Sequence, residues 1–439
     1  MPVKQKFWGP LLLIGILAVP ALAKEIPYDR YASPPSGLKP ASSFSAGQFL
    51  VYSFELIRWP IDRSLVYIEK NHLYDKVYWI YQEMKKQGIT LRFLKGAGFQ
   101  DGFGGGFLVD FMKIARLKET LPQLSVDGSA AWTTDKITLY KADILQKMAD
   151  TGLRAGGSFR YESRGEEHFY GIGPHTSLGD GTSFKSERTT LATLLGYSFF
   201  KTWDLEGKFA YQNVNITNGE DGGRGIIDDI FVATGRQRVP GLAGDQILSW
   251  GLDLKHDTRD ELEIPSQGGY EKFHFSYQKG IENDTGYLKY RADVAHFFKL
   301  FSERRVIALR GLGEINEALG ERQVPFFDMA RLGGYGTHPR LGDVHRGFKR
   351  DRFYDNDLFL LNLEYRWTIW EYRHWRMDSV LFWDEGQVFN RVHHFKFRDF
   401  RDSYGFGFRV VRMKEVVFTF EVARSDEGTE FYAGTAAPF

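Results

Sequence analysis

The residue types that most often perform enzymatic chemistry are missing from this sequence or stand in unsuitable patterns. The 439 residues include no Cys, which excludes disulfides, thiolate zinc sites and cysteine nucleophiles. No Gly-x-Ser-x-Gly nucleophile elbow occurs, and no helical pattern with Lys-Ser or Lys-Thr follows the glycines at 104–106. His393 and His394 could ligate a metal, but a solvated pair in a charged loop is the simpler interpretation. We therefore predict no enzymatic activity, no cofactor and no metal site.

A long, basic loop at residues 331–353 contains the most unusual charged motif. It is rich in Gly and includes the tripeptide Arg346-Gly347-Phe348. A loop of this length is usually either functional or disordered. The two strand-like segments after it carry Glu364 and the motif Phe382-Trp-Asp384-Glu-Gly386. The motif therefore pairs one loop cation with two carboxylates on consecutive strands.

The spacing of these charges predicts a structural contact inside a barrel. We interpret residues 357–370 as a strand with Leu358 and Leu360 on one face and Asn362, Glu364 and Arg366 on the opposite, polar face. Glu364 and Asp384 are expected to point inward on adjacent strands and to bind Arg346 through charge-assisted hydrogen bonds. Removing Arg346 would leave two crowded carboxylates, so we expect this residue to fix the loop.

A second polar motif lies between two strand-like segments at residues 257–269. It contains Asp257, Arg259 and Asp260, followed by Pro265 and Gly268. Pro265 would end the pairing of a strand, and Gly268 permits an unusual backbone conformation. By itself the pattern predicts a structural turn.

Together these motifs resemble the BamA/TamA family of outer-membrane barrels, also called the bacterial surface antigen family. That family carries Val-Arg-Gly-Phe/Tyr in its sixth outer loop, a Glu on the next strand, Phe-x-Asp-x-Gly on the one after, and an Asp-Thr-Arg-Asp…Pro…Gly turn in mid-barrel. The resemblance is clear over residues 245–439, and over 89–244 it rests on length and strand pattern. His345 departs from the family, which usually has Val or Leu before the Arg.

The resemblance implies insertion or translocation of proteins or lipid at the outer membrane. The implied partners are outer-membrane lipid and client outer-membrane or secreted proteins. Family members usually receive substrates through periplasmic POTRA domains, but the residues between position 23 and the first strand are too few for one such module. We therefore expect the short branch that lacks these domains. A passive or helix-plugged channel is the alternative, a surface adhesion barrel is a third possibility, and the sequence does not indicate an oligomeric state.

The remaining pattern predicts an all-β fold, a transmembrane antiparallel β-barrel of sixteen strands at residues 89–439. Segments of about ten residues alternate two by two, and short connections near 201–202, 301–303 and 413–414 contrast with long ones at 217–244 and 317–355. A soluble sandwich or propeller is the competing all-β fold. The high aromatic content, the signal peptide and the terminal Phe439 favour the barrel. We expect Phe439 to close the last strand and act as a membrane-insertion signal.

The N-terminal part has a different character. Residues 1–23 combine two Lys, a short apolar run and an Ala-Leu-Ala site, as in a signal peptide. Residues 24–88 are expected to hold a linker and an amphipathic helix at 60–87, ended by Gly88. The near balance of 57 basic and 56 acidic residues gives no indication of nucleic-acid binding. We therefore expect an integral protein of the outer membrane.

Overall fold

A computed structural model describes residues 67, 73–93, 104–115, 120–121, 123–133, 136–149, 151–219, 225–226, 239–335, 344–434 and 437–439. The predicted signal peptide and most of the linker lie outside these residues. The described residues divide into two units, one that ends at Glu83 and one that begins at Met84.

The short N-terminal helical segment is confirmed as helix α3, Leu73–Lys86. Lys85 and Lys86 occupy its last turn, where positive charge complements the helix dipole. Gly88, with a φ of 88°, ends it and leads into the first strand. The expected start near residue 60 lies outside the described residues. A second helix, α4, spans only Phe111–Ile114.

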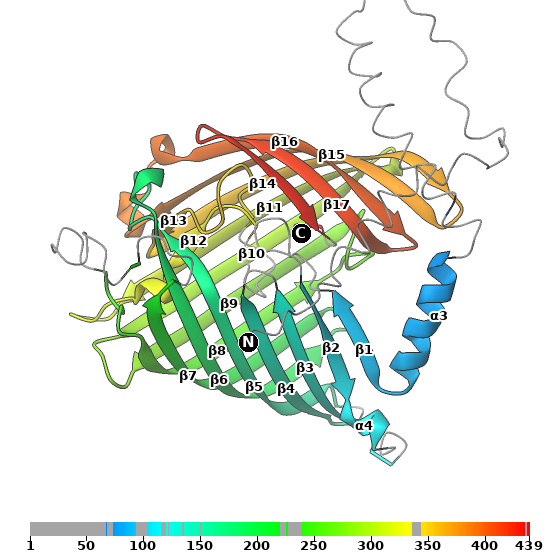
Figure 1. Ribbon diagram of the computed structural model, residues 1–439, viewed down its shortest axis with the longest axis horizontal. Coiled ribbons are helices and arrows are strands. Elements are labelled where there is room, and N and C mark those ends of the chain that lie inside the picture. Colours follow the sequence, from blue (N-terminus) through cyan, green and yellow to red (C-terminus); the bar gives the residue numbers. More distant parts are fainter. Residues whose placement is uncertain are drawn as a thin grey trace, which may run out of the picture. The chain divides into compact units, whose positions relative to one another are not determined.

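Sixteen antiparallel strands of the described residues form one sheet in which strands pair in chain order, except that β11 pairs with β14 (Figure 1). The strands are β1 Ile89–Phe93, β2 Gly104–Asp110, β3 Leu124–Thr133, β4 Ile137–Lys147, β5 Leu153–Phe169, β6 Thr182–Phe199, β7 Trp203–Asn218, β8 Asp245–Asp257, β9 Gly268–Gly280, β10 Gly286–Leu300, β11 Ser302–Ala318, β14 Asp357–Tyr372, β15 Trp375–Phe389, β16 Arg401–Arg412, β17 Glu415–Arg424 and β18 Thr429–Gly434. The predicted transmembrane barrel of sixteen strands is confirmed. Its edges are β1 and β18, which within the described residues pair only with β2 and β17.

The connections differ at the two ends of the strands, as predicted. At one end, tight turns place Lys201, Phe301, Arg373 and Met413 at positive φ, as short hairpin turns require. At the other end, long segments join β7 to β8 and β11 to β14. In outer-membrane barrels the short turns face the periplasm and the long loops face outward.

The long segment between β11 and β14 contains ordered structure of its own. It holds a second, two-stranded sheet made of β12, Ala330–Leu332, and β13, Phe353–Asp355. A hydrophobic cluster joins this segment to the inner wall of the barrel. Its members are Leu312, Ala330, Leu332, Phe348, Phe353, Leu358, Leu360 and Val388. The loop is therefore packed against the strands that follow it.

Side chains alternate between a filled interior and an apolar outer face. Along β14, Leu358, Leu360 and Glu364 are buried, whereas Leu361 and Leu363 are each 38% exposed. The expectation that Leu358 and Leu360 face away from Glu364 is wrong, because residues separated by an even number share one face of a strand. Large apolar side chains such as Phe273 and Leu381 are exposed on the outer face, as hydrocarbon contact requires.

Candidate functional site

Arg346, in the long loop, lies fully buried against carboxylates of the barrel wall. Its Nε and Nη2 atoms donate to the two oxygens of Asp384 at 2.7 Å each, a bidentate arrangement. Its Nη1 donates to Glu364 at 2.6 Å. The Arg346 backbone N–H also donates to Asp384, at 3.1 Å. The structure thus brings together the three charges that the sequence singled out.

Further charges complete this arrangement. Glu421 accepts from Arg346 at 3.3 Å and from Arg409 at 2.7 Å. Glu364 accepts two hydrogen bonds from Arg409, at 2.8 and 3.0 Å, and one from Arg366 at 2.7 Å. We call these six residues the charge network; they are Arg346, Arg366, Arg409, Glu364, Asp384 and Glu421. The network contains three cations and three carboxylates, so its formal charge is zero.

The strands fix the network because all its members except Arg346 stand on the inner face of four adjacent strands, β14, β15, β16 and β17. Asn362 on β14 is directly opposite Asp384 on β15, and its amide donates to that carboxylate at 2.8 Å and to the loop carbonyl of Val344. The ring of Phe382 lies 3.6 Å below the Arg346 guanidinium. Burial opposes the charged form of Arg346, but Asp384, Glu421 and Glu364 raise its pKa well above the usual value.

Gly347 and Phe348 hold the loop next to the network. Gly347 has a φ of 88°, and a Cβ there would lie 2.8 Å from the Cβ of Ser403, so only Gly suits this position. Its N–H donates to the Tyr432 hydroxyl at 2.9 Å, and its carbonyl accepts from Ser425 at 2.6 Å. Phe348 is 1% exposed within the loop cluster. Gly386 leaves room for the loop, because a Cβ there would lie 2.9 Å from Leu332.

Four residues of this site were not predicted from the sequence. Arg409 and Glu421 on β16 and β17, the loop residue Tyr335, which bonds to Glu421, and Tyr432 on β18 were not singled out. Arg409 and Glu421 interrupt strands that are otherwise rich in apolar residues. A charged residue at an inward position of such a strand is the signal that could have found them.

His345, the departure from the family pattern, is buried beside the network. Burial lowers the pKa of His345 to about 3; an interaction with the Arg401 backbone opposes this shift, and the Arg346 and Arg401 charges add to it. Neither ring nitrogen has a hydrogen bond of ordinary geometry within the described residues. The ring instead packs against Phe348, with centroids 4.6 Å apart. His345 is thus a neutral side chain in an apolar position.

Replacing His345 by Val is therefore expected to stabilise the protein. Removing a buried ring whose two nitrogens have no hydrogen bond of ordinary geometry within the described residues should add about 1–2 kcal/mol to the free energy of unfolding. Urea unfolding in detergent micelles measures this change. His175→Val is the matched control, because the His175 side chain is 67% exposed and should change little. A clear loss of stability in His345→Val would contradict the prediction.

The turn between β8 and β9 contains the predicted motif, from Asp257 to Gly268. Arg259 donates to both oxygens of Asp257, at 2.9 and 2.8 Å, and its guanidinium lies 4.6 Å from the Tyr270 ring. The Asp260 carboxylate accepts from the backbone N–H groups of Ser266 and Gln267. Burial alone would raise the pKa of Asp260, but a hydrogen bond from the Ser266 hydroxyl, together with those from the backbone, outweighs it and lowers the pKa.

The same turn also contacts strands far away in the sequence. Glu263 accepts from the Val416 N–H of β17 at 3.0 Å, and Glu261 bonds to Lys414. Ile264, which precedes the buried Pro265, packs with Val411 and Val416. The motif therefore connects β8 and β9 to β16 and β17 at the end of the short turns.

Replacing Gly268 by Ala is expected to disrupt this turn. Gly268 has a φ of 90°, and a Cβ would lie 2.2 Å from the Thr258 carbonyl oxygen. The strain should lower the free energy of unfolding by about 1–3 kcal/mol, measured by urea unfolding in micelles. The control is Gly207→Ala, where the nearest atom would be 3.9 Å away. Equal stability of the two variants would argue against a structural role for this turn.

Phe439 does not close the last strand, which was the prediction. β18 ends at Gly434. The Phe439 ring packs against a buried cluster on β10 and β11 that includes Phe297, and its carbonyl oxygen accepts from Arg366 at 3.0 Å. The end of the chain thus turns toward the inner wall, because cationic and apolar partners are available there. Its role as an insertion signal stays a prediction.

Other findings concern the functions that the sequence argued against. Within the described residues, no cluster of three or more His, Asp or Glu is placed to hold a metal ion. His393 and His394 are exposed in the loop after β15. None of the described helices is both long enough and apolar enough to cross a membrane.

The sixteen-stranded sheet and the charge network within it define the chain as an outer-membrane β-barrel. The model of the Omp85 superfamily domain matches residues 124–412, more than half of the 439 residues. The chain therefore belongs to the Omp85 superfamily, which confirms the resemblance to BamA/TamA-type barrels. Barrels of this superfamily insert or secrete proteins at the outer membrane.

Solved structures agree on the fold. BamA from Haemophilus ducreyi lacking POTRA domains 1–3 is similar with a TM-score of 0.56 and 15% identity, over 79% of this chain and 69% of that one. CdiB from Escherichia coli is similar with a TM-score of 0.50 and 11% identity, over 79% of this chain and 62% of that one. The comparison with curated proteins gives no match.

Proposed function

We propose that this barrel inserts or translocates client proteins at the outer membrane, and that the charge network fixes the long loop inside it for that purpose. The observation that carries the proposal is the fully buried contact of Arg346 with Asp384 and Glu364. A buried ion pair contributes little net stability compared with apolar packing. A network of six such charges is therefore better explained by a need to hold one loop conformation than by stability alone.

The edges of the sheet support a mechanism in which the barrel opens sideways. β1 and β18 are the edges of the sheet, and within the described residues each pairs with one neighbour only. A contact between them would be the one join of the barrel that no pairing within the described sheet makes, so we expect it to be where the barrel opens. We infer that clients or lipids enter the membrane at this position.

The first measurement compares the outer-membrane proteome and lipid content of a deletion strain with those of its parent. Selective loss of one protein, or a shift in surface lipid, supports the proposal and identifies the client. The deletion strain is then complemented with barrels in which the seam, the contact between β1 and β18, is locked by a disulfide. Because the chain has no native Cys, Cys pairs with one member in β1 and one in β18 give an unambiguous cross-link.

Locked barrels are expected to fail to restore the parental proteome until the disulfide is reduced. The control pair is Ser158→Cys with Ala192→Cys, which face each other in β5 and β6 and should restore it fully. If seam-locked barrels restore the proteome, sideways opening is not the mechanism.

The alternative function, a passive or helix-plugged channel, predicts a different result. Deleting residues 60–87 should then raise the conductance in a planar bilayer. The packing of the loop cluster against Leu312, Leu360 and Val388 disfavours an open conduit. An increase in conductance together with an unchanged proteome would favour the channel.

A further inference from the structure

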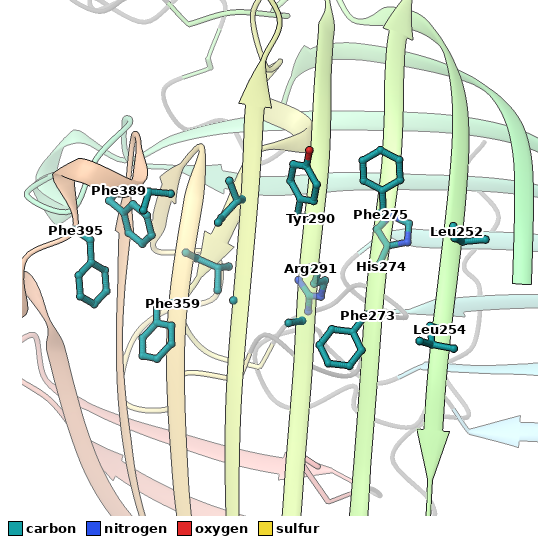
Figure 2. Close-up of a pocket in the computed structure, with 15 residues that line it drawn as sticks. Leu252, Leu254, Phe273, His274, Phe275, Tyr290, Arg291, Phe359, Phe389 and Phe395 are labelled. Atoms are coloured by element: carbon teal, nitrogen blue, oxygen red, sulfur yellow. The ribbon is translucent and has the colours of Figure 1, made fainter. Parts of the chain in front are cut away.

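The outer wall of the barrel contains an apolar groove that the charge network and the loop do not explain. The groove has a volume of about 460 Å³ and crosses the outer face from β8 to the end of β15. Figure 2 shows its labelled side chains over a row of neighbouring strands, with Leu252 and Leu254 at one side and Phe389 and Phe395 at the other. A concave apolar surface of this kind suits an apolar ligand.

Small residues on β10 and β11 create the hollow. Gly313 is paired with Ala292 on one side and with Phe359 on the other. Their neighbours Arg291 and Glu314 form an ion pair of 2.6 Å inside the barrel, so alternation places Gly313 and Ala292 on the outer face. A Cβ at Gly313 would meet no atom within 4 Å. The space directly above Gly313 is therefore not filled by neighbouring side chains.

Aromatic rings form the end of the groove that lies toward the long loops. Phe395 packs against Phe359 and Phe389, with ring centroids 5.9 and 5.5 Å apart, and against Phe397 and Phe400. Phe397 is nevertheless 84% exposed. Aromatic side chains at this level of a barrel lie at the interface between hydrocarbon and lipid head groups.

The loop that carries these rings also carries exposed positive charge. Arg391, Lys396 and Arg398 are all exposed, and the only acidic residue among residues 390–400 is Asp399, 3.6 Å from Arg398. Residues 390–400 therefore have a formal charge of +2 with His neutral. Lys and Arg side chains at this position can bind phosphate oxygens.

We propose that the groove binds one acyl chain of an anionic, phosphate-bearing lipid of the outer leaflet, with the phosphate held by the loop of residues 390–400. The apolar groove and the basic loop are continuous, since Phe395 lines the groove and Lys396 follows it directly. A lipid of this class is the occupant whose chain and head group match both surfaces. The inference rests on the barrel fold and is independent of the proposed function.

Two sets of variants of the full chain test the proposal. Gly313→Leu fills the groove, and its backbone φ is not in the left-handed region. Gly157→Leu is the matched control on the outer face of β5, where a Cβ would be at an ordinary distance of 3.5 Å from its nearest atom. The third variant replaces Arg391, Lys396 and Arg398 by Gln. Heat-modifiable mobility in electrophoresis verifies that each barrel has folded.

Native mass spectrometry of the purified barrel then measures binding of phosphatidylglycerol and of phosphatidylcholine with identical chains. We expect the native chain and Gly157→Leu to prefer phosphatidylglycerol. Gly313→Leu should bind it about tenfold more weakly, the effect of losing contacts to two or so methylene groups. The triple variant should bind both lipids alike.

Three results would overturn the proposal. Equal phosphatidylglycerol binding by Gly313→Leu and the native chain would show that the groove is not the site. A retained preference for phosphatidylglycerol in the triple variant would show that the loop does not hold the phosphate. A dimer that Gly313→Leu abolishes, with lipid binding unchanged, would show that a second copy of the chain occupies the groove.

Discussion

Replacing Glu364 by Gln should unfold the barrel or prevent its assembly. Glu364 accepts hydrogen bonds from Arg346, Arg366 and Arg409. In the variant, three buried guanidiniums would share two carboxylates. Leaving a buried charge uncompensated costs about 3–5 kcal/mol. The measurement is the fraction of heat-modifiable barrel in outer membranes, followed by urea unfolding of any barrel that folds.

Glu371→Gln is the control for this experiment. Glu371 lies on the same strand and pairs with Arg304 at 2.5 Å, but the two side chains are 40% and 67% exposed. An exposed ion pair contributes about 0.2–1 kcal/mol or less. If both Glu variants are equally stable, the charge network does not hold the barrel together.

Replacing Arg346 by Ala should release the long loop from the barrel wall. Asp384 would lose the two hydrogen bonds from the Arg346 side chain, and Glu364 and Glu421 would each lose one. The free energy of unfolding should again fall by about 3–5 kcal/mol. Part of this loss should appear as local unfolding of the loop while the rest of the barrel stays folded. Limited proteolysis in micelles should therefore cut the loop between β11 and β14 faster than in the native chain.

A double variant shows how much of the stability lost in Arg346→Ala comes from unbalanced charge and how much from lost packing. Arg346→Ala with Asp384→Asn leaves two guanidiniums and two carboxylates in the network, so its stability should exceed that predicted by adding the two single effects. Arg304→Ala is the control with an exposed partner. Proteolysis of the loop at the native rate in Arg346→Ala would contradict the role given to this residue.

The barrel was predictable because its signals are local and repeated. Two-residue alternation, tight turns near Lys201 and Met413, and long segments before β8 and β14 each follow from strand geometry. The error over Leu358 and Leu360 arose from the assignment of faces, since the alternation itself places them with Glu364. Beyond the last strand no repeating pattern exists, and the position of Phe439 depends on Arg366 and Phe297, which are distant in sequence.

The charge network was only half predictable. Arg346, Glu364 and Asp384 stand in recognisable motifs within 39 residues of one another. Arg409 and Glu421 reach the network only because the sheet curves and brings the inner faces of β16 and β17 against the loop. Likewise, the contact of Glu263 with Val416 joins residues separated by 153 positions. Nothing in either local sequence indicates such a partner.

The charge network is almost completely buried, since Arg366, its most exposed member, is 4% exposed, and this burial determines how the network responds to salt. Dissolved ions screen exposed charges within about 10 Å at 0.1 M salt, but they screen buried pairs far less. Arg346, Arg409, Glu364, Asp384 and Glu421 are all 0% exposed. The strength of the contact between the long loop and the charge network should therefore not change with ionic strength. The affinity of the basic loop at residues 390–400 for anions, in contrast, should fall as ionic strength rises.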